Sequence, residues 1–334
     1  MLFWPRVSIL LVRVNQAGWT LAEKRFAGLP AALKMNQALN RVCPLCGEPK
    51  AGPFLQKGEL HLVRCVRCAM IYVNPVLPDF ATGAFYDEAG TEYLAADKLE
   101  SDYSDVRFER ELRLFRTHCP RGSVLDVGCS SGGFLHQLKR RHPGDYQVWG
   151  TDVSRAPLDH AAKMGVSVIK GNFLSHPFEQ SFDAVTFWAV MEHLFEPRLF
   201  LKKAASILKT GGLCFILVPN MNSLAVRLIG AKYRYIFAEH LNYFTPATLT
   251  KFAGQEFAFV DLKSTHFNPL VIWKDFRGGA REIPREERSQ LLKRTTAWKK
   301  SRWLRPVKAG YEAVEMALGM VGLADNLVLV GRKS

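Results

Sequence analysis

Short apolar runs alternate with amphipathic segments from residue 124 onward. The apolar runs are rich in β-favouring residues and end at glycine, proline or aspartate, and the segments between them place apolar residues at helical spacing. The pattern predicts seven strands, at 124–127, 147–151, 166–169, 182–188, 213–218, 258–267 and 326–331. Strands that alternate with helices are typical of a doubly wound parallel sheet, so we expect an α/β fold with a seven-stranded Rossmann-like sheet.

The stretch VLDVGCSSGGF, residues 124–134, joins the first strand to a helix through a turn of small residues. Gly128 and Gly132 let a ligand approach the backbone. Ser130 stands where a dinucleotide fingerprint requires glycine, and the carboxylate of Asp126 precedes the turn by two residues. Both features disfavour a pyrophosphate. S-adenosylmethionine, which has no phosphate and carries an ammonium and a sulfonium, suits this turn better. Asp152 ends the second strand, where an acidic side chain accepts hydrogen bonds from ribose hydroxyls.

The turn resembles motif I of the class I S-adenosylmethionine-dependent methyltransferases, in which the acidic residue and the glycines hold the methionyl part of the cofactor. Further segments carry a related resemblance, to zinc-ribbon methyltransferases of bacterial cell-surface polysaccharide clusters and to quinone and fatty-acyl methyltransferases. They are SFDAVTFWAVMEHLFEP (181–197), LKTGGLCFILVPN (208–220) and HLNYFTPATL (240–249). The resemblance covers roughly residues 40–265 and the last strand, and implies methyl transfer from S-adenosylmethionine.

The remaining cofactor positions follow from this resemblance. The class often has an acidic residue after the third strand for the adenine amino group. This chain has Asn172 there, whose amide oxygen accepts the same hydrogen bond. Phe173 is expected beside the adenine, and Trp188, at the end of the fourth strand, is the last predicted cofactor residue.

Methyl transfer to oxygen or carbon also requires a group that removes a proton from the acceptor. In similar fatty-acyl enzymes the glutamate of the E-H pair after strand four lines the active site, which implies Glu192. His240 is the preferred base because it precedes Tyr243 and Phe244 in the region after strand five, where acceptor pockets form. The alternatives are that Glu192 is only a carboxylate at a helix start and that His193, the third candidate, is a packed histidine.

Two C-x-x-C pairs separated by eighteen residues match the spacing of a zinc ribbon. The predicted ligands are Cys43, Cys46, Cys65 and Cys68. Four thiolates close the coordination shell, so we expect a structural rather than a catalytic zinc. Seven cysteines in this pattern suit a reducing compartment better than a disulfide framework.

These features divide the chain into an extension without a fold of its own, a zinc ribbon, a linker and a methyltransferase domain that carries a helical basic insert. The boundaries are 1–41, 42–75, 76–105, 106–334 and, for the insert, 268–323. Of the net charge of +14, the stretch 274–308 contributes twelve basic and four acidic side chains. An apolar stripe of Tyr311, Val314, Leu318 and Val321 closes the insert.

The basic insert has four interpretations: a helical cap with a solvated charged face, a clamp on an anionic substrate, a contact with an anionic membrane surface through 274–308, or an RNA contact. No run reaches the roughly 18 to 20 apolar residues of a transmembrane segment, and the N-terminal apolar run lacks the features of a signal peptide. We therefore expect a cytoplasmic protein, or a peripheral one at the inner face of the membrane.

The predicted acceptor is a small molecule, a sugar or a lipid-linked glycan. One alternative is an rRNA base methyltransferase that uses its ribbon for RNA recognition. The absence of an N-P-P-Y motif and of a P-C loop cysteine, and a nearly neutral core, make a nucleic acid the less favoured partner. The other alternative is a cofactor-binding scaffold without catalysis.

Overall fold

The computed structural model describes residues 38–334 apart from 84, 87–89, 91–93, 279–292 and 294–304. The predicted extension therefore lies almost wholly outside the described residues. Its last positions are held by the fold, since Leu39 exchanges backbone hydrogen bonds with Val76. Two sheets organise the described chain, one of seven strands and one of four.

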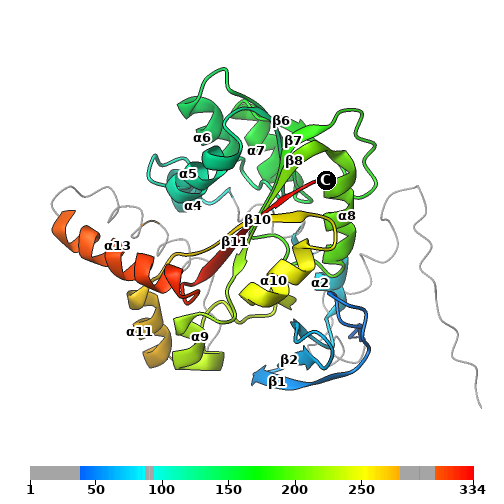
Figure 1. Ribbon diagram of the computed structural model, residues 1–334, viewed down its shortest axis with the longest axis vertical. Coiled ribbons are helices and arrows are strands. Elements are labelled where there is room, and N and C mark those ends of the chain that lie inside the picture. The colour runs from blue at the N-terminus through cyan, green and yellow to red at the C-terminus, as the bar shows by residue number, and fades with distance from the viewer. Residues whose placement is uncertain (1–37, 84, 87–89, 91–93, 279–292, 294–304) are drawn as a thin grey trace, which may run out of the picture. The chain divides into compact units, whose positions relative to one another are not determined.

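The large sheet has the strand order β10-β11-β8-β7-β4-β5-β6, which confirms the predicted fold (Figure 1). The five strands from β8 to β6 are parallel, while β11 runs antiparallel between β10 and β8. The strands are β4 (Gly122–Val127), β5 (Tyr146–Thr151), β6 (Ser167–Ile169), β7 (Phe182–Trp188), β8 (Leu208–Pro219), β10 (Ala258–Thr265) and β11 (Asn326–Arg332). Each predicted strand is present, and β8 begins five residues early because its start pairs with Phe182 before a register shift.

Helices cover both faces of this sheet because successive strand residues point to opposite sides. In β4, Val124 packs among α5 (Glu109–His118), α6 (Gly133–Arg141) and α7 (Arg155–Lys163). Leu125 packs on the other face, with α8 (Pro197–Ile207) and α10 (Pro246–Ala253). The buried ribbon residues Leu45, Met70 and Tyr72 belong to this second cluster, so the ribbon covers part of the sheet as a helix would.

The small sheet has the order β1-β2-β3-β9 and is antiparallel throughout. Its first three strands, β1 (Ala51–Lys57), β2 (Leu60–Cys65) and β3 (Ile71–Val73), come from the predicted ribbon. The fourth, β9 (Asn242–Tyr243), comes from the methyltransferase part and pairs with Ile71 and Tyr72 of β3. Sequence reasoning treated the ribbon as a module of its own, and this shared strand is new.

The segment predicted as a linker contains the short helices α2 (Pro78–Thr82) and α4 (Ala96–Asp102). Its end is fixed against the glycine-rich turn, because the hydroxyl of Tyr103 donates to the carbonyl of Ser131 and Asp102 accepts from the hydroxyl of Ser131. The following helix begins at Glu109, since Phe108 adopts a left-handed backbone with φ of 59°.

Between β10 and β11 the structure describes α11 (Pro269–Gly278) and α13 (Arg305–Met320). Most of the predicted basic stretch 274–308 lies outside the described residues. The predicted apolar stripe on α13 is wrong in part: Val314 and Val321 are exposed by 50% and 65%. The helix instead turns buried Glu315 inward, where it pairs with Arg110 and accepts from the backbone N–H of His266. No helix among the described residues is long and apolar enough to cross a membrane.

The helices α9 (Leu224–Ile229) and α11 and the 3-10 turn η3 (Gly230–Lys232) complete the described elements. Together with the small sheet they enclose a second core, which includes Ile71, Leu241, Tyr243 and Val271. The chain between η3 and β9, which carries His240, contributes Tyr233, Ile236 and Leu241 to this core.

Candidate active site and metal centre

The predicted cofactor turn lies at the carboxyl end of β4, as sequence reasoning expected. Gly128 and Gly132 have φ of +74° and +78°, the left-handed region that glycine adopts without strain. Space is also short: a Cβ on Gly128 would lie 2.6 Å from Cγ2 of Val190, and a Cβ on Gly132 would lie 2.8 Å from Cβ of Ala161. Glycine is therefore required at both positions.

The two acidic side chains flank this turn. Asp152 accepts backbone hydrogen bonds from Ser130 at 2.8 Å and from Ser154 at 2.8 Å, which ties the end of β5 to the turn. Asp126 is 3% exposed and accepts from the hydroxyl of Thr186 at 2.7 Å. Burial raises the pKa of the Asp126 carboxyl to about 7 and that of Asp152 above its ordinary value. A cationic ligand beside them would favour their charged forms.

Two polar atoms at these strand ends are buried and have no hydrogen-bond partner in the described part of the chain. They are the hydroxyl of Ser130 and Nε1 of Trp188. Ser130 has φ of 50°, which is uncommon for a residue other than glycine. Buried polar atoms of this kind are the groups that a bound ligand satisfies. With the glycine cradle and the two carboxyls, they fit S-adenosylmethionine.

The structure places the predicted adenine neighbours less directly. Asn172 is exposed and its side-chain oxygen accepts from the backbone N–H of Leu174 at 2.8 Å. Phe173 is 4% exposed, and its ring stacks on that of Phe200 with centroids 5.5 Å apart. That ring is part of the core on the α8 face of the sheet. An adenine contact through either residue stays a prediction.

The three candidate catalytic residues come together. Glu192, His193 and His240 each offer one oxygen or nitrogen atom, and these atoms lie within 4.8 Å of one another. The two imidazole rings meet edge to face with centroids 4.7 Å apart. Such a spacing would also allow one metal ion to contact all three, although no ion is needed to explain the packing. The E-H pair after β7 and the histidine before β9 thus form one site.

Glu192 is the least compensated group of this cluster. It is 1% exposed, and neither carboxyl oxygen has a hydrogen-bond partner among the described residues. Burial raises the pKa of Glu192 to about 8, so the carboxyl is largely protonated at neutral pH. The alternative of a carboxylate at a helix start does not match its position, because Glu192 lies in a turn and α8 begins only at Pro197.

Backbone carbonyls orient the two histidines. Nδ1 of His240 lies 2.9 Å from the carbonyl oxygen of Tyr235, so it must carry the proton that it donates. In the neutral ring the lone pair is then on Nε2. Nδ1 of His193 lies 2.9 Å from the carbonyl of Glu239 and 2.7 Å from the hydroxyl of Tyr86. The carbonyl of Tyr235 thus fixes the tautomer of a neutral His240.

Sequence reasoning missed two residues that hold this cluster in place. The side-chain amide of Asn242 donates to the carbonyls of Met191 and Leu194, at 2.8 and 2.7 Å. Half-buried Arg41 donates to the carbonyls of Val73, Phe195 and Leu241 and to the side chain of Asn242. Asn242 lies within the HLNYFTPATL signature, which was a usable signal, whereas nothing in the sequence around Arg41 indicated this role.

A short chain segment connects the cofactor turn to the catalytic cluster. Val190, which contacts the space above Gly128, is two residues from Glu192. Ala189 has φ of 58°, so the chain turns sharply where β7 ends. The glycine turn and the Glu192 cluster therefore face the same edge of the sheet.

The four ribbon cysteines also converge. Their sulfur atoms lie within 4.8 Å of one another, with Cys43 to Cys68 at 3.4 Å and Cys46 to Cys65 at 3.6 Å. Sulfurs on a tetrahedral zinc with bonds of about 2.3 Å are separated by roughly 3.8 Å, so the donor set fits zinc.

The two C-x-x-C loops also fold alike. The backbone N–H of Gly47 donates to the carbonyl of Cys43, and the backbone N–H of Ala69 donates to the carbonyl of Cys65. Gly47 and Ala69 both have positive φ, of 74° and 61°. Two matching loops that present four thiols to one point are what a ribbon site requires.

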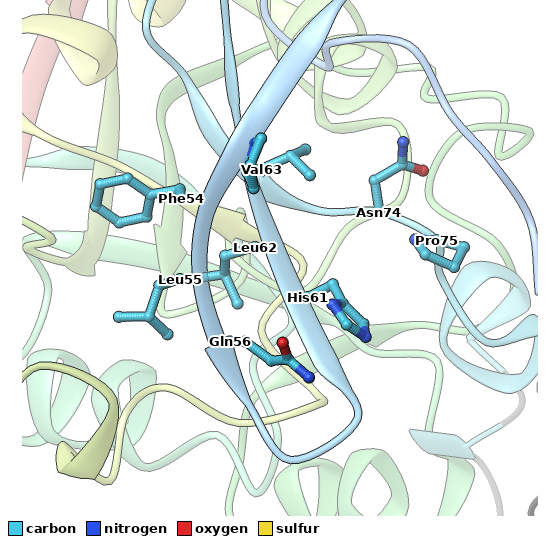
Figure 2. A pocket seen from close by; sticks show the side chains of 9 residues that line it. Phe54, Leu55, Gln56, His61, Leu62, Val63, Asn74 and Pro75 are labelled. Atoms are coloured by element: carbon cyan, nitrogen blue, oxygen red, sulfur yellow. The ribbon is translucent and has the colours of Figure 1, made fainter.

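A pocket of about 540 Å³ lies on the ribbon hairpin and not at the strand ends (Figure 2). It is lined by residues of β1 and β2 with Asn74 and Pro75, and includes none of the predicted catalytic, cofactor or metal residues. The chemistry of its lining, mostly apolar with Gln56 and His61, does not connect it to methyl transfer.

Known proteins resemble the chain over its central part. Residues 101–261, just under half of the chain, match the family model described as methyltransferase domain. The ubiquinone biosynthesis O-methyltransferase of Coxiella burnetii is 28% identical over 165 residues, which are 44% of this chain and 68% of that protein. The protein of that name from Psychrobacter cryohalolentis is 30% identical over 164 residues, 44% of this chain and 63% of that protein.

Solved structures also resemble the chain. A methyltransferase of Thermotoga maritima, described as a possible histamine N-methyltransferase, has 18% identity and a TM-score of 0.48, with 75% of this chain and 99% of that chain covered. The N-methyltransferase NodS of Bradyrhizobium japonicum, solved with S-adenosyl-L-homocysteine, has 13% identity and a TM-score of 0.45, with 74% and 97% covered. On the family match and the curated relatives, this chain carries a class I S-adenosylmethionine-dependent methyltransferase domain.

Proposed function

We propose that the chain transfers a methyl group from S-adenosylmethionine to a hydroxyl of a small-molecule, sugar or lipid-linked acceptor, at the Glu192–His193–His240 cluster. The observation that carries the proposal is the convergence of this buried polar cluster with the glycine turn at one edge of the sheet. The name of the curated relatives, which are O-methyltransferases, supports oxygen as the acceptor atom.

The cofactor would be held at the carboxyl ends of β4, β5 and β7. In this proposal Asp126, Gly128, Ser130 and Gly132 contact its methionyl part, and Asp152 binds the ribose hydroxyls through lone pairs left over from its two backbone partners. Bound S-adenosylmethionine supplies an electrophilic methyl group.

The chain's own residues would position the acceptor and take its proton. A hydroxyl placed against Nε2 of His240 can pass its proton to the imidazole as the new bond forms, because Nδ1 is already committed to the carbonyl of Tyr235. The neutral carboxyl of Glu192 can donate a hydrogen bond to the acceptor or to a histidine. Closing the site to water would strengthen both contacts.

The ribbon would bind one structural zinc through Cys43, Cys46, Cys65 and Cys68. A complete set of four sulfur ligands leaves no position for substrate, so the ion stabilises the fold and takes no part in the transfer.

The test is methyl transfer by the variant His240→Gln, followed as release of S-adenosyl-L-homocysteine over a panel of phenol, sugar and lipid-linked acceptors. We expect kcat to fall by about 100-fold or more, as for loss of a general base, with unchanged S-adenosylmethionine affinity in calorimetry. His61→Gln, an exposed histidine of the ribbon, is the matched control. Equal turnover by His240→Gln and wild type would contradict the assignment of the base.

Failure of the whole panel would have a different meaning. Cofactor binding without any turnover would favour the scaffold alternative. Turnover only with ribosomal RNA would favour the base-methylating alternative.

A further inference from the structure

Helix α11 exposes a stripe of large apolar side chains. Leu270 is 69% exposed and Trp273 is 53% exposed, and with Lys274 and Arg277 they repeat at the i, i+3, i+4, i+7 spacing that places residues on one helix face. The opposite face packs on the protein, since Val271 is buried. A scattered exposed leucine is ordinary, whereas an ordered stripe that includes an aromatic residue is not.

The neighbouring elements extend this face. Phe276 of α11 is 58% exposed, with the ammonium of Lys232 from η3 lying 4.9 Å from its ring centroid. The guanidinium of Arg277 lies 4.3 Å from the ring centroid of Trp273. Leu228 of α9 is 63% exposed. Figure 1 shows α9 and α11 side by side, at the lower left of the picture.

The charge of this face has one sign. The segments 224–232 and 269–278 contain four cations, Arg227, Lys232, Lys274 and Arg277, all exposed. Their one carboxylate, Asp275, is buried and held by Arg234, whose Nη2 lies 2.6 Å from Oδ1. No exposed negative charge of these two segments offsets the cations.

Aromatic and aliphatic side chains among exposed cations are the composition of a surface that binds in the interface of an anionic membrane. The apolar groups enter the boundary of the acyl chains, aromatic rings settle at the level of the headgroups, and cations meet the lipid phosphates. A partner protein surface of standard size would instead deplete lysine from its centre.

We propose that the face formed by α9, η3 and α11 docks the protein reversibly on an anionic lipid surface, through Leu228, Leu270, Trp273 and Phe276 together with Arg227, Lys232, Lys274 and Arg277. This face shares Lys274, Phe276 and Arg277 with the predicted contact through 274–308, but most of that stretch lies outside the described residues, and the face adds α9, η3 and the start of α11. It does not depend on which acceptor is methylated.

The experiment is co-sedimentation of the full chain with vesicles of phosphatidylcholine, alone or with phosphatidylglycerol. The test variant is Leu270→Ser with Lys274→Glu. The matched control is Leu199→Ser with Lys202→Glu on α8, which removes an exposed leucine and reverses an exposed lysine on a helix that packs on β8. Both variants change the net charge equally, and circular dichroism melts establish that both are folded.

We expect the wild type to bind the anionic vesicles and not phosphatidylcholine alone, with binding that weakens as salt rises. The α11 variant should bind about 30-fold more weakly, as expected for two units of charge near the surface, and the α8 variant within about twofold of the wild type. Should the α11 variant unfold, Trp273→Phe gives the same answer, because it should remove the blue shift of tryptophan fluorescence that vesicles induce.

Three results would overturn the proposal. The first is equal vesicle binding by the two double variants, and the second is equal binding of the wild type to both kinds of vesicle. The third is that the wild type binds no vesicles while the α11 variant changes its oligomeric state. The last result would identify the face as a contact between copies of the chain.

Discussion

The cofactor turn and the catalytic cluster lie at one edge of the sheet but are held in opposite ways. The turn is local: Asp126, the glycines and Asp152 lie within 27 residues, and each is fixed by the strand that carries it. The cluster is assembled from segments near residues 86, 192 and 240, with Arg41 behind them. Its supports therefore come from distant parts of the chain, and the pairing of β9 with β3 links them to the ribbon.

This difference leads us to expect that the ribbon supports the proposed acceptor side of the site. The strand β9 belongs to the ribbon sheet and begins at Asn242, two residues after His240. The backbone carbonyl of Glu192 accepts from Leu241 and Asn242, so the two catalytic segments are bonded to the same strand. Damage to the ribbon should reach the acceptor side first, and damage to the glycine turn should reach the cofactor alone.

The largest effect should come from the metal. Cys43→Ser removes one of the four proposed zinc ligands, so we expect metal analysis to find much less than one zinc per chain and the melting temperature to fall by about 10 °C, equivalent to a few kcal/mol. Turnover should drop by about 100-fold through displacement of β9, while the S-adenosylmethionine dissociation constant changes by no more than about threefold.

Cys119→Ser is the control for this change, because Cys119 is buried outside the four-cysteine cluster and its Sγ donates to the carbonyl oxygen of Arg121. If Cys43→Ser lost cofactor and acceptor binding together, the comparison between the two regions would fail.

The reciprocal change is Gly132→Ala. A Cβ there meets Ala161 at 2.8 Å in a backbone of positive φ, so we expect S-adenosylmethionine to bind about 100-fold more weakly in calorimetry, with unchanged zinc content. Gly144→Ala is matched in backbone strain, with φ of +85°, but its Cβ would meet nothing within 4 Å. Similar losses in both variants would mean that strain, and not the cradle, is responsible.

Arg41→Met should sharpen the comparison. Its loss removes the guanidinium donor of the Phe195 carbonyl and leaves the Leu241 carbonyl with the backbone N–H of Val73, so unfolding should become easier by about 2 to 3 kcal/mol and kcat should fall by about tenfold. The affinity for S-adenosylmethionine should not change. Arg64→Met, which removes an exposed arginine stacked on Phe54, should affect neither quantity. A loss of cofactor affinity in Arg41→Met would show that the two regions are not separate.

The smallest effect concerns pH. Burial raises the pKa of Glu192 from 4.5 to about 8, so between these values the folded chain keeps a proton that the unfolded chain releases. Stability therefore falls as pH rises through this window, by about 2 kcal/mol between pH 6 and 8. Glu192→Gln cannot lose a proton and should flatten this part of the profile in denaturant titrations. Glu179→Gln, on an exposed side chain, should leave the slope as in the wild type.

The sheet and the cofactor turn were predictable because their signals are local. Apolar runs such as 182–188 identify strands, and the residues from Asp126 to Gly132 identify their own turn without help from the rest of the chain. The convergence within each pair of cysteines was equally predictable, since their spacing alone brings the two residues of a pair together.

What could not be predicted depends on contacts between distant segments. The pairing of β3 with β9 joins strands of three and two residues, too short for any periodicity. The face that α13 turns toward the protein is set by buried Glu315 and its partner Arg110. A pattern of apolar residues cannot predict such a polar contact. The core position of Phe173, which lies in a turn, likewise depends on Phe200 of α8.

The same pairing constrains how the chain is made. Strand β3 ends at Val73, and its partner β9 begins at Asn242. During vectorial synthesis the ribbon therefore leaves the ribosome with one edge of its sheet open, and more than half of the chain must follow before that edge is closed. Such a ribbon cannot be moved between proteins as a cassette. We expect it to be a long-lived binding site for chaperones, and the high contact order of this closure to place it late in folding.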